Sequence, residues 1–262
     1  MVERHWKLRR DPFAGNSPCY VATPVHAEAE ARLVHALTSG DRRVVLRAEA
    51  GLGKSLLLAR VLDRVREPTR RVVRVASPTD GASLFAACAE GLGGRLPPDP
   101  GRPRAWRALA DAARLCRLQG QAIVLAVDDD QGLNRPEDRL DLDRLVHLDP
   151  HPEARVSVLR VGRLSEEEPS DPWELVIRLL PLTRSEAEQY LSAKLAAAGR
   201  DEPTFTPRAL TRLHALSGGV PRGLDRLASL ALMAGAARGL EIIPPEVVEA
   251  AALECAGALE AA

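Results

Sequence analysis

Residues 43–65 combine a short apolar run, a glycine-rich loop and a stretch with helical spacing. The run "RVVLRA" predicts a buried strand, and "SLLLARVLDRV" predicts a helix whose apolar face runs through Leu58, Leu62 and Val65. Between them, "AEAGLGKS" matches the phosphate-binding pattern G-x-x-x-x-G-K-[ST], except that Ala48 replaces the first glycine. This strand, loop and helix predict a nucleotide-binding α/β fold; the alternative is a glycine-rich turn with a solvated lysine.

A loop of this kind wraps backbone N–H groups around phosphates at the N-terminus of a helix. Its lysine contacts the β and γ phosphates, and its serine hydroxyl contacts magnesium. Ala48 is tolerable there unless the position needs a positive φ, which alanine resists. The predicted nucleotide-binding residues of the loop are Ala50, Gly51, Leu52, Gly53, Lys54, Ser55 and Leu56.

Four further aliphatic runs follow at intervals, and most are separated by segments with helical spacing. They are "RVVRVA" (71–76), "AIVLAV" (122–127), "RVSVLRV" (155–161) and "ELVIRLL" (174–180). Alternating strands and helices favour a parallel sheet covered by helices on both faces. The expected class is therefore α/β, a P-loop NTPase with a parallel five-stranded sheet.

The third of these five strands runs directly into three carboxylates, Asp128, Asp129 and Asp130. Ligands of parallel sheets bind beyond the carboxyl ends of the strands. Carboxylate oxygens are preferred ligands of Mg²⁺, so Asp128, together with Ser55, is the predicted metal-binding pair. The alternative is an acidic turn that ends a core strand.

From Thr183 onward the sequence changes to helices punctuated by Pro, Thr and Gly. Thr183 and Glu186 have the spacing of a capping box. We therefore expect three parts: an N-terminal linker and first helix (1–40), a P-loop nucleotide-binding α/β domain (41–182) and a small all-α lid domain (183–262).

Composition excludes several functions. The 36 basic and 36 acidic side chains cancel, so no whole-molecule field attracts nucleic acid. The four cysteines lack the close pairing of a zinc or redox site, which favours a reducing, cytoplasmic location. No apolar run is long enough to predict a membrane segment. Only Lys7, Lys54 and Lys194 are lysines, so arginine dominates and the lysine in the loop stands out.

The chain resembles the AAA+ ATPases of the general secretion ATPase A (ExeA-like) family, to which transposition ATPases of the TnsC and TniB type are related. The resemblance extends from about Trp6 to Val248. The segments that carry it are "DPF", "TPVHAEAEARL", "GLGKSLLLARVL", "VLAVDDDQGL", "LPLTRSEAEQYLSAKLAAAG" and "LSGGVPRGLDRLASLAL".

The resemblance implies binding of ATP and Mg²⁺ between the sheet domain and the lid, with ATP and ADP as ligands. It implies that Arg222, in "GGVPR", is the lid arginine that reaches the phosphates; a solvated arginine is the alternative. Asp129 takes the place of the family's glutamate, which polarises the attacking water, so Asp129 and Lys54 are the predicted catalytic residues. Asp128 would assist the metal.

Three departures from the family pattern bear on turnover. The Asp129 carboxylate is one methylene shorter than glutamate, and misplacement by about 1 Å can cost on the order of a hundredfold in rate. Arg163 stands where the family has a polar sensor, and it is either a phosphate ligand or a surface arginine. Pro172 stands where the family has a residue that resembles an arginine finger, which predicts slow hydrolysis.

The sequence thus favours an ATP-binding AAA+ module that hydrolyses ATP slowly and changes the conformation of an unknown protein partner or of a homo-oligomer. One alternative is a nucleotide-dependent switch or scaffold that does not hydrolyse ATP. Another is a DNA-binding ATPase of the transposition type. That alternative needs a phosphate-binding arginine patch, for which a solvated face is the favoured explanation. The residues in question are Arg60, Arg64, Arg66, Arg70, Arg71 and Arg74.

Overall fold

The computed structural model describes residues 1–14, 20–133, 135–164 and 174–260, and the side chains only as far as residue 254. The chain forms two compact units. The sheet unit comprises residues 28–50 and 54–179, and the helical unit comprises residues 1–27, 51–53 and 180–262. Each unit has a hydrophobic core of its own.

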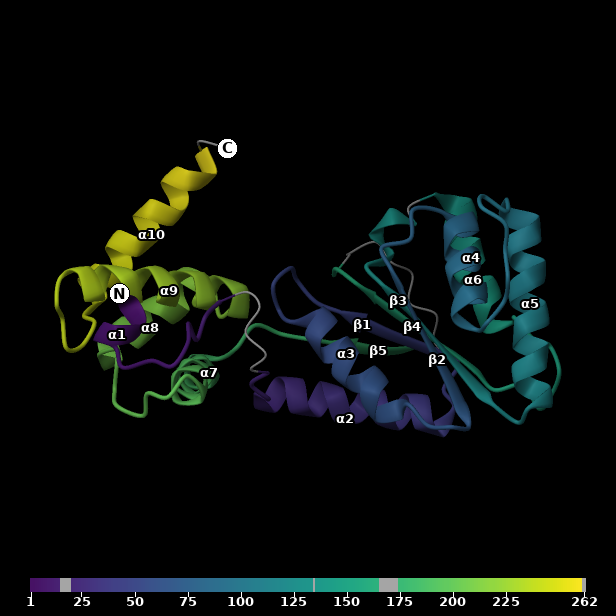
Figure 1. Ribbon diagram of the computed structural model, residues 1–262, viewed down its shortest axis with the longest axis horizontal. Helices are drawn as coiled ribbons and strands as arrows, with labels where there is room; N and C mark the ends of the chain where they lie inside the picture. The colour runs from purple at the N-terminus through teal and green to yellow at the C-terminus, as the bar shows by residue number, and fades with distance from the viewer. Residues whose placement is uncertain (15–19, 134, 165–173, 261–262) are drawn as a thin grey trace. The chain divides into compact units, whose positions relative to one another are not determined.

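The sheet unit is built on five parallel strands in the order β2-β3-β4-β1-β5 (Figure 1). All five strands predicted from the sequence are present. Their bounds are β1 (Arg43–Arg47), β2 (Arg70–Ala76), β3 (Ala122–Asp128), β4 (Val156–Gly162) and β5 (Leu175–Arg178).

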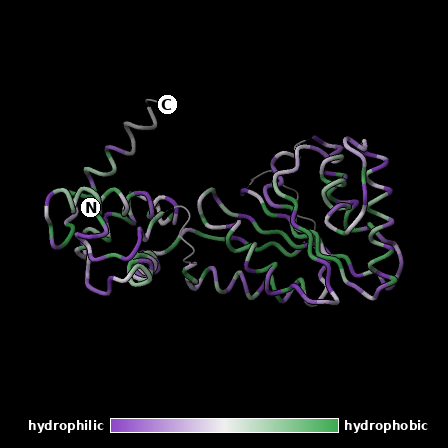
Figure 2. Tube along the Cα trace, viewed as in Figure 1, coloured by the Kyte–Doolittle hydropathy of each residue, from purple (hydrophilic) through white to green (hydrophobic). Residues whose placement is uncertain are grey.

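Burial explains the two kinds of strand sequence. The central strands β3 and β4 are covered on both faces, so almost every residue is buried and most side chains are apolar, with Ser157 and Arg160 as the polar exceptions in β4. Strand β2 lies at an edge, and there the buried Val73 and Val75 alternate with the exposed Arg74 and Ala76. Figure 2 shows the apolar strands running through the middle of this unit.

Helices cover both faces of the sheet (Figure 1). One face carries α3 (Lys54–Val65) and most of α2 (Pro24–Ser39). The other carries α4 (Gly81–Gly91), α5 (Arg102–Leu118) and α6 (Pro136–Val146), which enclose the main core. Residues Leu58, Leu62 and Val65 of α3 are buried, as their spacing predicted.

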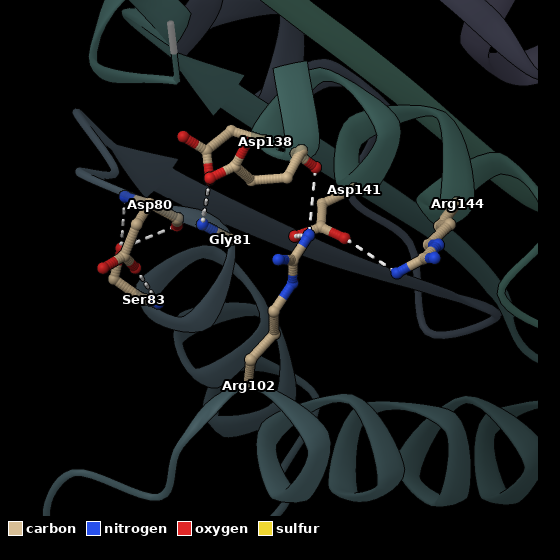
Figure 3. A network of polar contacts seen from close by, with 8 residues as sticks. Asp80, Gly81, Ser83, Arg102, Asp138, Asp141 and Arg144 are labelled. Carbon is tan, nitrogen blue, oxygen red and sulfur yellow. Dashed lines mark hydrogen bonds and ion pairs between the residues drawn. The ribbon is translucent and has the colours of Figure 1, made fainter. Parts of the chain in front are cut away.

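A buried polar network ties α4, α5 and α6 together (Figure 3). Asp138 of α6 accepts a hydrogen bond of 3.0 Å from the N–H of Gly81, the first residue of α4. Asp141, completely buried, forms ion pairs with Arg102 of α5 and Arg144 of α6. A Cβ on Gly81 would overlap the Asp141 carboxylate, so glycine is required there. The carboxylates also complement the positive end of the α4 dipole.

The helical unit contains α1 (Val2–His5), α7 (Arg184–Ala197), α8 (Pro207–Ser217), α9 (Pro221–Ala237) and α10 (Pro245–Glu260). The capping box predicted at the start of α7 is present, with Thr183 and Glu186 each bonded to the backbone of the other. Thr206 caps α8 through the N–H of Ala209 at 3.1 Å.

The N-terminal residues, expected to form a linker and first helix, pack into the core of this helical unit. Trp6 is 1% exposed, and its indole N–H donates to the Leu232 carbonyl of α9 at 2.9 Å. The Arg200 guanidinium lies 5.0 Å from the centre of the Trp6 ring. Leu8 and Phe13 are buried in the same core. The segment is thus a structural part of the helical unit.

Candidate nucleotide site

The loop between β1 and α3 has the backbone that a phosphate-binding loop requires. Gly51 and Gly53 have φ angles of 87° and 85°, which other residues adopt only with strain. Ala48 is not among the positive-φ residues of the described chain, and its side chain is fully buried at the end of β1. Alanine therefore fits the position where the pattern has its first glycine.

Lys54, the first residue of α3, turns back onto this loop. Its ammonium group donates to the carbonyl oxygens of Ala48 at 2.9 Å and Glu49 at 2.8 Å. These two carbonyls help to hold the positive charge at the loop. An anionic phosphate is a stronger acceptor than a carbonyl, so it would compete for the same donors.

Ser55 and Asp128 are brought together although 73 residues separate them. The Ser55 hydroxyl lies in the first turn of α3, and it is 3.4 Å from Oδ1 of Asp128 at the end of β3. Ser55 follows β1 and Asp128 ends β3, and these strands are not neighbours, since β4 lies between them in the sheet. Their proximity therefore depends on the tertiary fold. A hydroxyl beside a carboxylate is the set of hard oxygen ligands that Mg²⁺ prefers.

The other oxygen of Asp128 has an arginine partner. Arg74 of β2 places a guanidinium nitrogen 2.6 Å from Oδ2. The Asp128 side chain is 9% exposed and that of Arg74 is 40% exposed. In the sequence Arg74 was only one member of an arginine cluster, so its contact with the predicted metal ligand was missed.

Asp129 and Asp130 separate into two different environments. Asp129 has a left-handed backbone, with φ 62°, and an exposed side chain. Asp130 is buried and forms ion pairs with Arg47 of β1 at 3.0 Å and Arg160 of β4 at 3.3 Å. The exposed carboxylate is the one available to solvent and ligands, whereas Asp130 joins the ends of three strands.

The end of β4 supports the loop, and the sensor position follows it. The N–H of Ala48 donates to the carbonyl of Gly162 at 3.3 Å, and a Cβ on Gly162 would overlap the Asp130 carboxylate. Arg163, at the sensor position, is exposed. Pro172 lies outside the described residues.

Loop residues 51–53 belong to the helical unit, and two of them form hydrogen bonds with other residues of that unit. His26 is buried, and its ring binds the Thr23 hydroxyl through Nδ1 at 2.7 Å and the Leu52 carbonyl through Nε2 at 2.9 Å. The backbone N–H of Arg222 donates to the Gly51 carbonyl at 3.3 Å, and the Arg222 side chain is exposed. The role of His26 was missed because nothing in the sequence links residue 26 to residue 52.

Most of the arginine cluster is paired with acceptors of the protein itself. Arg60 and Arg64 both contact the buried Glu30 carboxylate, at 3.3 and 2.9 Å. Arg70 contacts Glu67 at 3.4 Å, and Arg71 donates to the Gln121 side chain at 3.2 Å. These contacts favour a protein surface stabilised by ion pairs over a patch reserved for nucleic acid.

A parallel sheet with the order 2-3-4-1-5, a glycine-rich loop after β1 and an aspartate at the end of β3 define the P-loop NTPase class, α/β proteins with helices on both faces of the sheet. The family model of the AAA domain matches residues 37–168. The chain belongs to this AAA domain family, and the resemblance to the ExeA-like ATPases inferred from the motifs is confirmed.

A curated relative extends the match over almost the whole chain. General secretion pathway protein A of Aeromonas hydrophila is 29% identical over 272 residues, which cover 98% of this chain and 49% of that protein. The chain therefore spans about half the length of this relative.

Solved structures share the fold at low identity. Cdc6p from Pyrobaculum aerophilum has a TM-score of 0.75 and 18% identity, covering 94% of this chain and 71% of that one. The Aeropyrum pernix ORC1 protein in complex with DNA has a TM-score of 0.71 and 20% identity, covering 93% and 68%. Thermotoga maritima RuvB, the Holliday junction branch migration motor, has a TM-score of 0.57 and 15% identity, and the match covers 87% of this chain and 67% of that one. These similarities confirm the AAA+ fold with a helical C-terminal region.

Among the described residues, no helix combines the length and the apolar character that crossing a bilayer requires.

Proposed function

We propose that this AAA+ module binds Mg-ATP at the loop 48–55, hydrolyses it slowly to ADP and phosphate, and uses the bound state to change the conformation of a protein partner or of further copies of itself. The observation that carries the proposal is the convergence of Lys54, Ser55 and Asp128 at one end of the sheet. A lysine, a hydroxyl and a carboxylate at this place are the groups that phosphates and a divalent cation need.

Each group has a distinct role in the proposal. The Lys54 ammonium exchanges the Ala48 and Glu49 carbonyls for phosphate oxygens. Ser55 and Asp128 hold Mg²⁺, which supplies neutralisation of the phosphate charge. Asp129, which follows Asp128 in the sequence and is exposed, accepts the proton of the attacking water, and Arg222 is a phosphate ligand, as the resemblance implies.

Two further observations support nucleotide binding. The loop glycines already have the φ angles that aim backbone N–H groups at an anion. One solved structure with the same fold, the Aeropyrum pernix ORC2 protein, contains ADPNP-ADP complexes; it has a TM-score of 0.68 and 19% identity.

The test is to incubate the purified chain with Mg²⁺ and ATP for hours, and then to release and identify the nucleotide. Lys54→Ala is the control because it removes the phosphate ligand. ADP formed by the natural chain alone supports a working ATPase in which Asp129 suffices. Absence of both ATP and ADP from the natural chain refutes the proposal.

A switch that binds ATP without hydrolysing it is the second candidate function. The short Asp129 carboxylate favours it, because among the described residues the Asp129 side chain has no hydrogen bond or ion pair that would fix its position, although its backbone N–H donates to the Val161 carbonyl at 2.9 Å. Retention of intact ATP by the natural chain, with hydrolysis gained by Asp129→Glu, would establish this candidate.

A DNA-binding ATPase is the third candidate, and the ion pairs of Arg60, Arg64 and Arg70 argue against it. Its support is that two proteins of similar fold, the Aeropyrum pernix ORC1 protein and Drosophila ORC, were solved with DNA bound. ATP-stimulated, salt-sensitive DNA binding that is lost with Arg64→Gln would support it. We expect none at low salt.

A further inference from the structure

The ion pair between Arg74 and Asp128 occupies the metal side of the proposed site. Asp128 has two oxygens, and both have partners: Oδ1 lies 3.4 Å from the Ser55 hydroxyl, and Oδ2 lies 2.6 Å from an Arg74 guanidinium nitrogen. The guanidinium therefore already offsets the charge of Asp128, the carboxylate that the proposed function assigns to the divalent cation.

The sheet explains how Arg74 reaches this position. Strand β2 is the edge neighbour of β3, and Arg74 is paired in register with Ala126, two residues before Asp128. The long arginine side chain extends from this position to the carboxylate. Arg74 lies on an edge strand and its side chain is 40% exposed. If the guanidinium leaves the Asp128 carboxylate, water can therefore solvate it.

We propose that Arg74 is an internal competitor for the metal at Asp128, a positioning residue that sets the Mg²⁺ concentration the protein requires. The inference rests on the proposed function, because it concerns the same metal site. The Arg74 guanidinium repels a divalent cation bound at Ser55 and Asp128. It also weakens the attraction between the cation and the Asp128 carboxylate, because it offsets part of the carboxylate charge. The metal therefore binds only by weakening the ion pair.

The ion pair also stabilises the metal-free protein. Asp128 is 9% exposed, and a carboxylate buried to that extent needs a partner. Arg74 supplies one when no metal is bound. Removal of Arg74 should therefore destabilise the metal-free chain and strengthen metal binding, two opposite effects of one substitution.

The chain offers a matched control on the same strand. Arg71 lies three residues before Arg74, and its side chain is exposed and donates to Gln121 at 3.2 Å. Arg71→Gln also removes one positive charge from β2, but the partner of Arg71 is Gln121 and that of Arg74 is Asp128. Arg74→Lys keeps a positive charge but replaces the guanidinium with a point charge, so we expect intermediate behaviour.

The experiment is a titration of the full chain with Mn²⁺ in the presence of ATP, followed by electron paramagnetic resonance. The free Mn²⁺ signal lost beyond that of a matched ATP solution without protein measures binding to the chain. Arg74→Gln should bind Mn²⁺ about two- to fivefold more tightly than the natural chain, a range that fits one partly exposed ion pair. Arg71→Gln should match the natural chain.

Thermal unfolding provides a readout independent of hydrolysis. Without metal, Arg74→Gln should melt at a lower temperature than the natural chain, and Mn²⁺ with ATP should raise its melting temperature by more. Mn²⁺ affinity equal to or weaker than that of the natural chain overturns the assignment of Arg74 and leaves the proposed function intact. If the natural chain binds Mn-ATP no better than Asp128→Asn, both proposals fail. If Arg74→Gln does not fold, the affinity of Arg74→Lys decides.

Discussion

Replacing Asp130 with asparagine should destabilise the sheet unit far more than the same replacement at Asp129, although the two are neighbours in sequence. Asp130 has 8% side-chain exposure, and it faces Arg47, whose side chain is 4% exposed, at 3.0 Å. Asparagine has almost the same shape as aspartate, so the change removes the charge and little else. The buried guanidinium of Arg47 then loses the charge of this carboxylate.

The magnitude follows from this burial. Removal of one partner of a buried ion pair costs about 3–5 kcal/mol. We expect about 3 kcal/mol for Asp130→Asn, since the amide oxygen still accepts a hydrogen bond. Arg160 adds little, because it is 22% exposed and also contacts Glu174 at 3.6 Å. At roughly 2–4 °C per kcal/mol, the melting temperature should fall by about 6–12 °C.

Urea unfolding of the two variants, followed by circular dichroism, measures the difference. Asp129→Asn should stay within about 0.5 kcal/mol of the natural chain, because the side chain is exposed and asparagine tolerates the left-handed backbone. It should keep nucleotide binding and lose hydrolysis. Equal stability of Asp130→Asn and Asp129→Asn would refute the assignment of Asp130 to a buried structural pair.

Three further outcomes are expected. Ala48→Gly should change nucleotide affinity less than about threefold in a fluorescent-nucleotide titration, because the position needs no positive φ; a larger gain would mean that alanine distorts the loop. Trp6→Ala should cost about 3–5 kcal/mol in urea unfolding, because it empties a buried site in the helical unit, and no loss would contradict that packing. The hydrogen bond from the Ser83 N–H holds the pKa of Asp80 below its usual 3.8, so its stabilisation is present above that pH and is lost as the pH falls further. Asp80→Asn should therefore flatten the acid limb of stability against pH, and an unchanged limb would contradict this.

The class of fold was predictable because its signals are local. Apolar runs of strand length, helical spacing between them and two loop glycines with positive φ depend on neighbouring residues, so all five strands and the capping box at Thr183 could be read in advance. The same holds for the loop lysine and serine, whose positions relative to the helix N-terminus follow from the motif.

The partners of charged groups were beyond such reasoning, since they depend on which strands become neighbours. Three consecutive aspartates look alike in sequence, yet the order 2-3-4-1-5 pairs Asp128 with Arg74 and Asp130 with Arg47, and leaves Asp129 exposed. Likewise, Trp6 enters a core formed by helices about 200 residues later, where its indole binds Leu232. Local sequence sets the backbone, whereas these contacts between distant residues arise only when the chain packs, because burial and ion pairing depend on which groups the fold brings together.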